Sequence, residues 1–86
     1  MANHKSALKQ HRQSLKRRTR NRASRSRMRS AVKHLRQLIV SDADGARSAL
    51  PTTLGLIDHT AKLGAIHDNA AARTKSRLTR AVNKAG

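Results

Sequence analysis

Residues 1–40 read MANHKSALKQHRQSLKRRTRNRASRSRMRSAVKHLRQLIV and contain neither glycine nor proline. Lys, Arg, Gln, Leu and Ala are good helix formers, so the stretch predicts one long helix from about Asn3 or Ser6 to about Val40. Its second half carries apolar residues at the spacing of a single helix face. These are Met28, Ala31, Val32, Leu35 and Ile39, with Leu38 alongside. We expect this half to pack against a core.

The first half of the same stretch lacks an apolar face. Leu8 and Leu15 are one heptad apart, but at about 100° per residue they point well away from the stripe that begins at Met28. A helix that is polar nearly all round either forms on a partner or frays. We therefore expect this half to be largely disordered in the isolated protein and to become ordered when bound.

Charge indicates the nature of that partner. The first forty residues hold thirteen Lys and Arg and no Asp or Glu, whereas the remainder holds seven basic and four acidic residues. Solvated helix faces usually mix signs to gain i, i+4 pairs, so an acid-free run favours a polyanion as the partner. Nucleic acid is the densest polyanion in a cell, and Lys and Arg would contact its phosphates.

The basic positions form two stripes on a helical wheel. One contains Lys5, Lys9, Arg12, Lys16, Arg20 and Arg27, and the other contains Arg18, Arg22, Arg25, Arg29, Lys33 and Arg36. Two stripes indicate a helix that lies between rows of phosphates rather than along a single row.

A second helix is predicted from about Ala46 to about Leu63. Residues 41–45, Ser-Asp-Ala-Asp-Gly, form the break before it, and Ser41, Asp42 or Asp44 can cap it. Pro51 leaves two alternatives open, because the helix either kinks there or begins there. Gly64 is suited to end the helix.

A third helix is predicted from about His67 to about Asn83, with Asn69 as a candidate N-cap. The sequence therefore predicts an all-α protein, a three-helix bundle with a long basic N-terminal helix. We expect one domain over residues 1–86, with a basic arm at 1–27 and the bundle at 28–86.

Composition excludes several classes of function. With no cysteine and no histidine cluster at ligand spacing, we expect no metal site and no cofactor. With no glutamate and no nucleophile–base constellation, we expect neither an enzyme nor a small-molecule substrate. No apolar run approaches the length of a membrane span, so we expect a cytoplasmic protein without a membrane partner.

The absence of Phe, Tyr and Trp limits how nucleic acid could be bound. Stacking of bases on aromatic rings is excluded, and so is an RNA-recognition motif. Phosphate and sugar contacts remain, and these read shape more than sequence. Charge alone does not separate RNA from DNA.

Two segments resemble a known family. Residues 2–7 (Ala-Asn-His-Lys-Ser-Ala), 12–14, 16–21 and 25–27 resemble the N-terminal helix of the bacterial small-subunit ribosomal protein S-twenty family. Residues 64–78 resemble that family's motif Gly-x-Ile-His-x-Asn-x-Ala-Ala-Arg-x-Lys-Ser-Arg-Leu. The resemblance covers nearly the whole chain. It departs at Gln10, where a basic residue is common, at Leu15, where a polar one is, and at Pro51 in the second helix.

The resemblance implies a non-catalytic ribosomal protein that binds small-subunit rRNA directly and supports its folding and assembly, with other small-subunit proteins as further partners. The RNA-binding residues that it implies are Asn3, His4, Lys5, Ser6, Lys9, Arg12, Ser14, Lys16, Arg17, Arg18, Arg20, Asn21, Arg25, Ser26, Arg27, His67, Asn69, Arg73, Lys75, Ser76 and Arg77. A histone-like DNA-compacting protein is the alternative that charge alone allows. A membrane-active amphipathic helix is less favoured, because Leu8 and Leu15 supply little apolar face.

Overall fold

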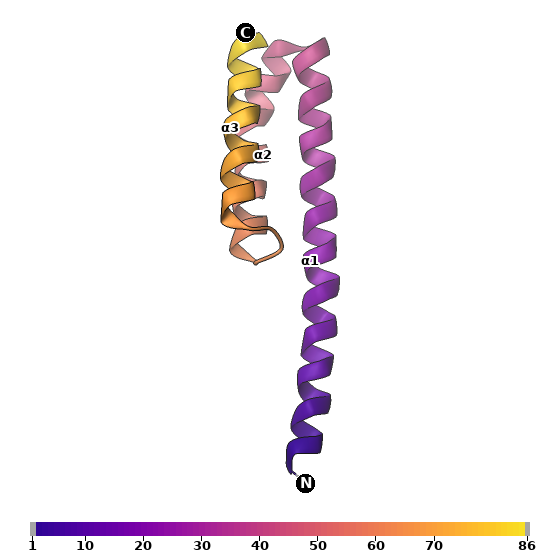
Figure 1. Cartoon of the computed structure of the whole chain (residues 1–86). Helices are drawn as coiled ribbons and strands as arrows, with labels where there is room; N and C mark the ends of the chain where they lie inside the picture. The colour runs from indigo at the N-terminus through magenta and orange to yellow at the C-terminus, as the bar shows by residue number, and fades with distance from the viewer. Residues whose placement is uncertain (1, 86) are drawn as a thin grey trace.

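The structure, a computed structural model, describes the backbone of residues 2–85 and the side chains of residues 6–85. It contains three helices: α1 (Ala2–Ser41), α2 (Ala43–Lys62) and α3 (Asp68–Ala85). Figure 1 shows α2 running antiparallel to α1, and α3 returning beside α2. The expected all-α fold with a long basic N-terminal helix is confirmed over these residues. The asymmetry of the molecule, 63 × 20 × 13 Å, follows from the length of α1.

A single residue, Asp42, joins α1 to α2. Its carboxylate accepts a hydrogen bond from the Gly45 N–H at 3.1 Å and so caps α2, which confirms one of the three predicted caps. The prediction that α2 begins near Ala46 was three residues too late. The cap satisfies the first turn of the helix, so Ala43 is already helical.

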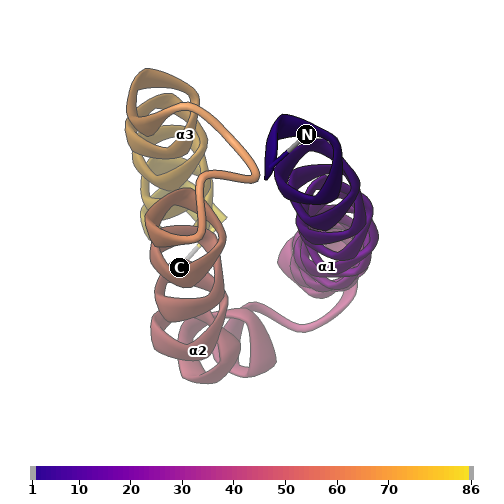
Figure 2. The same cartoon turned by 90° about the horizontal axis from the view of Figure 1, so that it is seen from below.

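Pro51 lies inside α2, so the helix does not begin there. Proline lacks an N–H and therefore leaves the carbonyl of Arg47 without its helical donor. Figure 2 shows the first turns of α2 displaced sideways from the rest of the helix, the bend expected at such a position. Pro51 is exposed, on a side of α2 that faces away from the buried Ile57.

Gly64 ends α2, as predicted. Its φ of 79° is in the left-handed region that favours glycine. The Gly64 N–H donates to the Ala61 carbonyl at 2.9 Å, and the Ala65 N–H donates to the Thr60 carbonyl at 3.1 Å. This is a Schellman motif, which turns the chain sharply into the short connection to α3.

The core lies where the second half of α1 meets α2 and α3. Its buried residues are Leu35, Ala46, Ile57, Ala71, Leu78 and Val82. Two buried threonines add no unsatisfied polar group, because the Thr53 and Thr60 hydroxyls donate to the carbonyls four residues earlier, at 3.0 and 2.7 Å. Burial of each large apolar side chain contributes roughly 1.5–3 kcal/mol, so this small core depends on a few residues.

Burial along α1 begins near Asn21, which is half-buried, and Ser24, which is 2% exposed. Every side chain from residue 6 to residue 20 is exposed. Figure 1 shows this part of α1 extending beyond the loop that connects α2 to α3. From here on, the arm means residues 2–20 of α1, a shorter segment than the predicted basic arm at 1–27. None of the described helices is long and apolar enough to cross a membrane.

Candidate nucleic-acid interface

The two cation stripes lie on opposite flanks of α1, and Arg18 is the one member of the second stripe that lies within the arm. The direction of the core is set by Leu35, which is fully buried on α1. At 100° per residue, Lys9, Lys16 and Arg20 lie about 60–100° to one side of this direction, and Arg18 lies about 100° to the other. The described side chains of both flanks are exposed. The arm therefore presents a line of cations on one flank and Arg18 on the other, with a separate face between them.

Among residues 6–85, no carboxylate side chain pairs with these cations. Asp42 is the cap of α2, Asp44 pairs with Arg47, and Asp58 pairs with Lys75 at 2.6 Å. Asp68 lies in the first turn of α3, where negative charge is favourable. All four acids thus belong to the bundle. The positive charge of the arm is left for a partner outside the chain.

The base of the arm meets the loop between α2 and α3. The Arg25 guanidinium donates to the Ala65 carbonyl at 3.4 Å across forty residues of sequence, and Ser24 is buried beside it on α1. Figure 2 shows the loop lying between α3 and α1. A hollow of about 440 Å³ at this end of the bundle is lined in part by Gly64, Ile66 and His67. The fold thus brings Arg25 of the N-terminal set and His67 of the C-terminal set of sequence-predicted residues to the same end of the bundle.

His67 holds the start of α3. Its Nδ1 accepts a hydrogen bond from the Asn69 N–H at 3.0 Å, and its carbonyl accepts from the Ala71 N–H, also at 3.0 Å. The prediction that Asn69 is the N-cap was wrong, because the cap lies two residues earlier and is an imidazole. The Asn69 side chain is exposed and carries no capping role.

The remaining predicted residues of α3 do not line the hollow at this end of the bundle. Arg73, Ser76 and Arg77 are exposed on a side of α3 that faces away from the buried Leu78, and Lys75 is directed to Asp58 of α2. In the arm, the predicted residues Ser6, Lys9, Arg12, Ser14, Lys16, Arg17, Arg18 and Arg20 are all exposed, as are Ser26 and Arg27. The side chains of Asn3, His4 and Lys5 lie outside the described residues.

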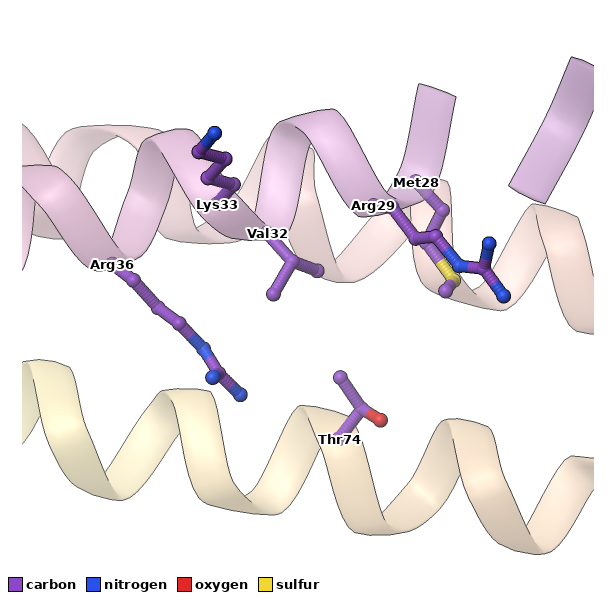
Figure 3. Close-up of a pocket in the computed structure, with 6 residues that line it drawn as sticks. All are labelled: Met28, Arg29, Val32, Lys33, Arg36 and Thr74. Carbon is purple, nitrogen blue, oxygen red and sulfur yellow. The ribbon is translucent and has the colours of Figure 1, made fainter. Parts of the chain in front are cut away.

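A groove between α1 and α3 adds cations that the predicted site left out. It has a volume of about 390 Å³ and is lined by Met28, Arg29, Val32, Lys33, Arg36 and Thr74. Figure 3 shows Val32 and Arg36 directed from α1 toward α3, with Thr74 directed back. Arg29, Lys33 and Arg36 continue the second cation stripe, and that stripe was the signal in the sequence that could have identified them.

The described residues offer no centre for metal chemistry, since no three His, Asp or Glu side chains among them come together. The available chemistry is that of Arg, Lys, amide and hydroxyl groups on an exposed helix. Such groups bind phosphate and sugar.

The fold and this surface define a class of small all-α proteins in which a compact bundle carries one long cationic helix. Within that class, the chain belongs to the ribosomal protein S20 family, because the family model described as "Ribosomal protein S20" matches residues 2–83. The resemblance inferred from the sequence is therefore confirmed. This family is one of ribosomal structural proteins and not of enzymes, which also confirms the exclusion of enzymatic activity.

Curated relatives agree over the full length of the chain. The protein named "Small ribosomal subunit protein bS20" of Solidesulfovibrio magneticus is 51% identical over 86 residues, covering 99% of this chain and 97% of its own. The protein of the same name from Geobacter metallireducens is 44% identical over 87 residues, covering all of both chains. That from Flavobacterium johnsoniae is 46% identical, covering 98% and 99%.

Proposed function

We propose that this chain, as a structural component of the small ribosomal subunit, binds small-subunit rRNA directly through α1 and supports the folding and assembly of that RNA. The observation that carries the proposal is the arm, an acid-free helix with cations on two flanks that projects beyond the bundle. Family membership supplies the ribosomal context. The ribosome would be its place in the cytoplasm, with neighbouring small-subunit proteins as further partners.

The two parts of the molecule have different roles in this proposal. The arm enters the RNA, and its Lys and Arg side chains neutralise phosphates where RNA helices converge. The bundle fixes the direction of the arm through the contact between Arg25 and Ala65. His67, which holds the start of α3, and the exposed Asn69 lie at the end of the bundle nearest the arm and would dock against the same RNA.

Salt dependence tests the proposal. Binding of the full chain to small-subunit rRNA should weaken steeply with salt, because about ten phosphate contacts predict a slope of several units in log affinity against log salt. Replacement of Arg17 by Ala should reduce that slope by about one unit or less. A wild-type slope near −1 would contradict a phosphate-binding arm.

DNA compaction remains the second candidate, because the cation stripes would also neutralise duplex DNA. The two candidates differ in selectivity, which is measured by binding folded small-subunit rRNA and random duplex DNA at one salt concentration. Preference for the folded rRNA is the outcome expected here. Equal affinity for both polymers would favour the DNA-compacting protein.

A further inference from the structure

The inner face of the arm, defined as Gln10, Gln13, Ser14 and Arg17, points in the same direction as the core-facing side of α1. At 100° per residue, these four residues fall within about 60° of the direction of Leu35. Further along α1 this direction is occupied by the buried Ser24 and the half-buried Met28. The face of α1 that packs on the bundle therefore continues into the arm, where nothing in the described chain covers it.

The inner face differs chemically from the two flanks of the arm. Gln10, Gln13 and Ser14 are neutral, and each can both donate and accept hydrogen bonds. All of them are exposed, and together with Arg17 they line a hollow of about 380 Å³. The inner face is thus mainly neutral, with Arg17 as the one cation among its four residues, and it runs between Lys9, Lys16 and Arg20 on one flank and Arg18 and Arg22 on the other.

The complementary surface has phosphates along two lines and uncharged polar groups between them. A groove of a double helix has this form. The minor groove of A-form RNA is wide and shallow and displays 2′-hydroxyls and base edges, whereas its major groove is too deep and narrow for side chains to read. Single-stranded RNA fits less well, because the chain has no aromatic side chain on which bases could stack.

Taking rRNA binding as proposed above, we infer that the inner face docks into the shallow minor groove of a double-helical RNA segment. Gln10, Gln13 and Ser14 hydrogen-bond to 2′-hydroxyls and base edges, and the flanking cations contact the phosphates of the two strands. The loop between α2 and α3 lies on the side of α1 that faces the bundle (Figure 1), and the Arg25–Ala65 contact holds it there. The bundle end therefore limits how far along α1 the RNA helix can extend.

Two kinds of contact with RNA can be measured independently here. Neutral side chains that bond to 2′-hydroxyls distinguish RNA from DNA but release no counterions. Flanking cations contribute to the salt slope and bind both polymers. Removal of the amides should therefore lower affinity for RNA without changing the salt slope.

The test compares the wild type with the double variant Q10A/Q13A, using an RNA duplex of about 20 base pairs and the DNA duplex of the same sequence. Two lost hydrogen bonds predict about a tenfold loss of affinity for the RNA duplex. The salt slope on RNA and the affinity for DNA should both stay at their wild-type values. Alanine is the better helix former, so the variant is not expected to lose helix content, which circular dichroism checks.

The control is Q37A, which removes the same side chain from the same helix. Gln37 is exposed and lies on the side of α1 away from Leu35, so its loss should leave RNA affinity unchanged. Unchanged RNA affinity in Q10A/Q13A, equal losses for RNA and DNA, or an equal loss in Q37A would overturn the inference. A steep wild-type salt slope on small-subunit rRNA would still support the proposed function, so the two failures are distinguishable.

Discussion

Residues 6–20 and 28–41 of α1 form two halves of one continuous helix, yet only the second half has a partner within the chain. Every side chain of residues 6–20 is exposed, whereas Leu35 in the second half is fully buried against α2 and α3. Both halves are cationic and built from good helix formers. The difference teaches that the apolar face, and not helix propensity or charge, decides which half the protein stabilises by itself.

The comparison is tested most strongly by removing one leucine from each half. Leu35→Ala should destabilise the bundle by about 2–5 kcal/mol, because it removes a fully buried side chain and leaves a cavity. Leu15, which is 46% exposed, should change stability by less than about 0.5 kcal/mol on the same replacement. Urea unfolding followed by circular dichroism measures both. Equal effects of the two changes would mean that the arm is packed as well as the bundle.

Amide hydrogen exchange on the free protein provides the next test. Amides of residues 6–20 should exchange close to the rate of an unstructured chain, and their order parameters should fall below about 0.6. Amides of residues 28–41 should be protected up to the global stability of the bundle. Addition of small-subunit rRNA should slow exchange in residues 6–20. Uniformly rigid values over both halves of the free protein would contradict the claim that only the second half of α1 is stabilised by the protein itself.

The smallest expected effect is at the end of the bundle beside the arm. His67→Ala removes the cap of α3 and should cost about 1 kcal/mol. His67→Asn keeps a good cap and should restore most of that stability, which a thermal melt measures as a recovery of Tm. Asn69→Ala, with no cap to lose, should leave Tm unchanged.

The same variants separate structure from docking. If this end of the bundle contacts RNA, Asn69→Ala and His67→Asn should each weaken binding to folded rRNA while leaving random duplex DNA binding almost unchanged. If only His67→Ala weakens binding, this end of the bundle acts by capping α3 and does not itself contact RNA.

Much of the fold was predictable from local signals. A break between the first two helices, a cap from among Ser41, Asp42 and Asp44, and a stop at Gly64 each depend on a few neighbouring residues. The structure has a break at Asp42 alone rather than over residues 41–45, with Asp42 as the cap, and Gly64 ends α2 as predicted. The errors concern the residues at which α2 and α3 begin. The Asp42 carboxylate caps α2, so the helix begins at Ala43 and not near Ala46. The His67 imidazole caps α3, so Asn69 is not the N-cap.

The cation stripes were also predictable, because they follow from a helical period in a run without glycine, proline or acids. The contact between the base of the arm and the loop that joins α2 to α3 was not predictable, since the hydrogen bond between Arg25 and Ala65 joins residues forty positions apart. For the same reason, the groove cations Arg29, Lys33 and Arg36 were visible as a stripe but not as the lining of a shared surface with Thr74.

By itself, the sequence determined the three helices, the absence of a catalytic constellation, the excess of positive charge in α1 and the family resemblance, because each depends on composition or on short-range spacing. The apolar stripe predicted the direction around α1 that packs on a core, but only the tertiary structure decided that α2 and α3 cover this direction and that the cover ends near residue 20. That direction is fixed by burial of Leu35 against α2 and α3, a free energy of contact between segments far apart in the chain. It makes Gln10, Gln13 and Ser14 an inner face and turns the two stripes into its flanks.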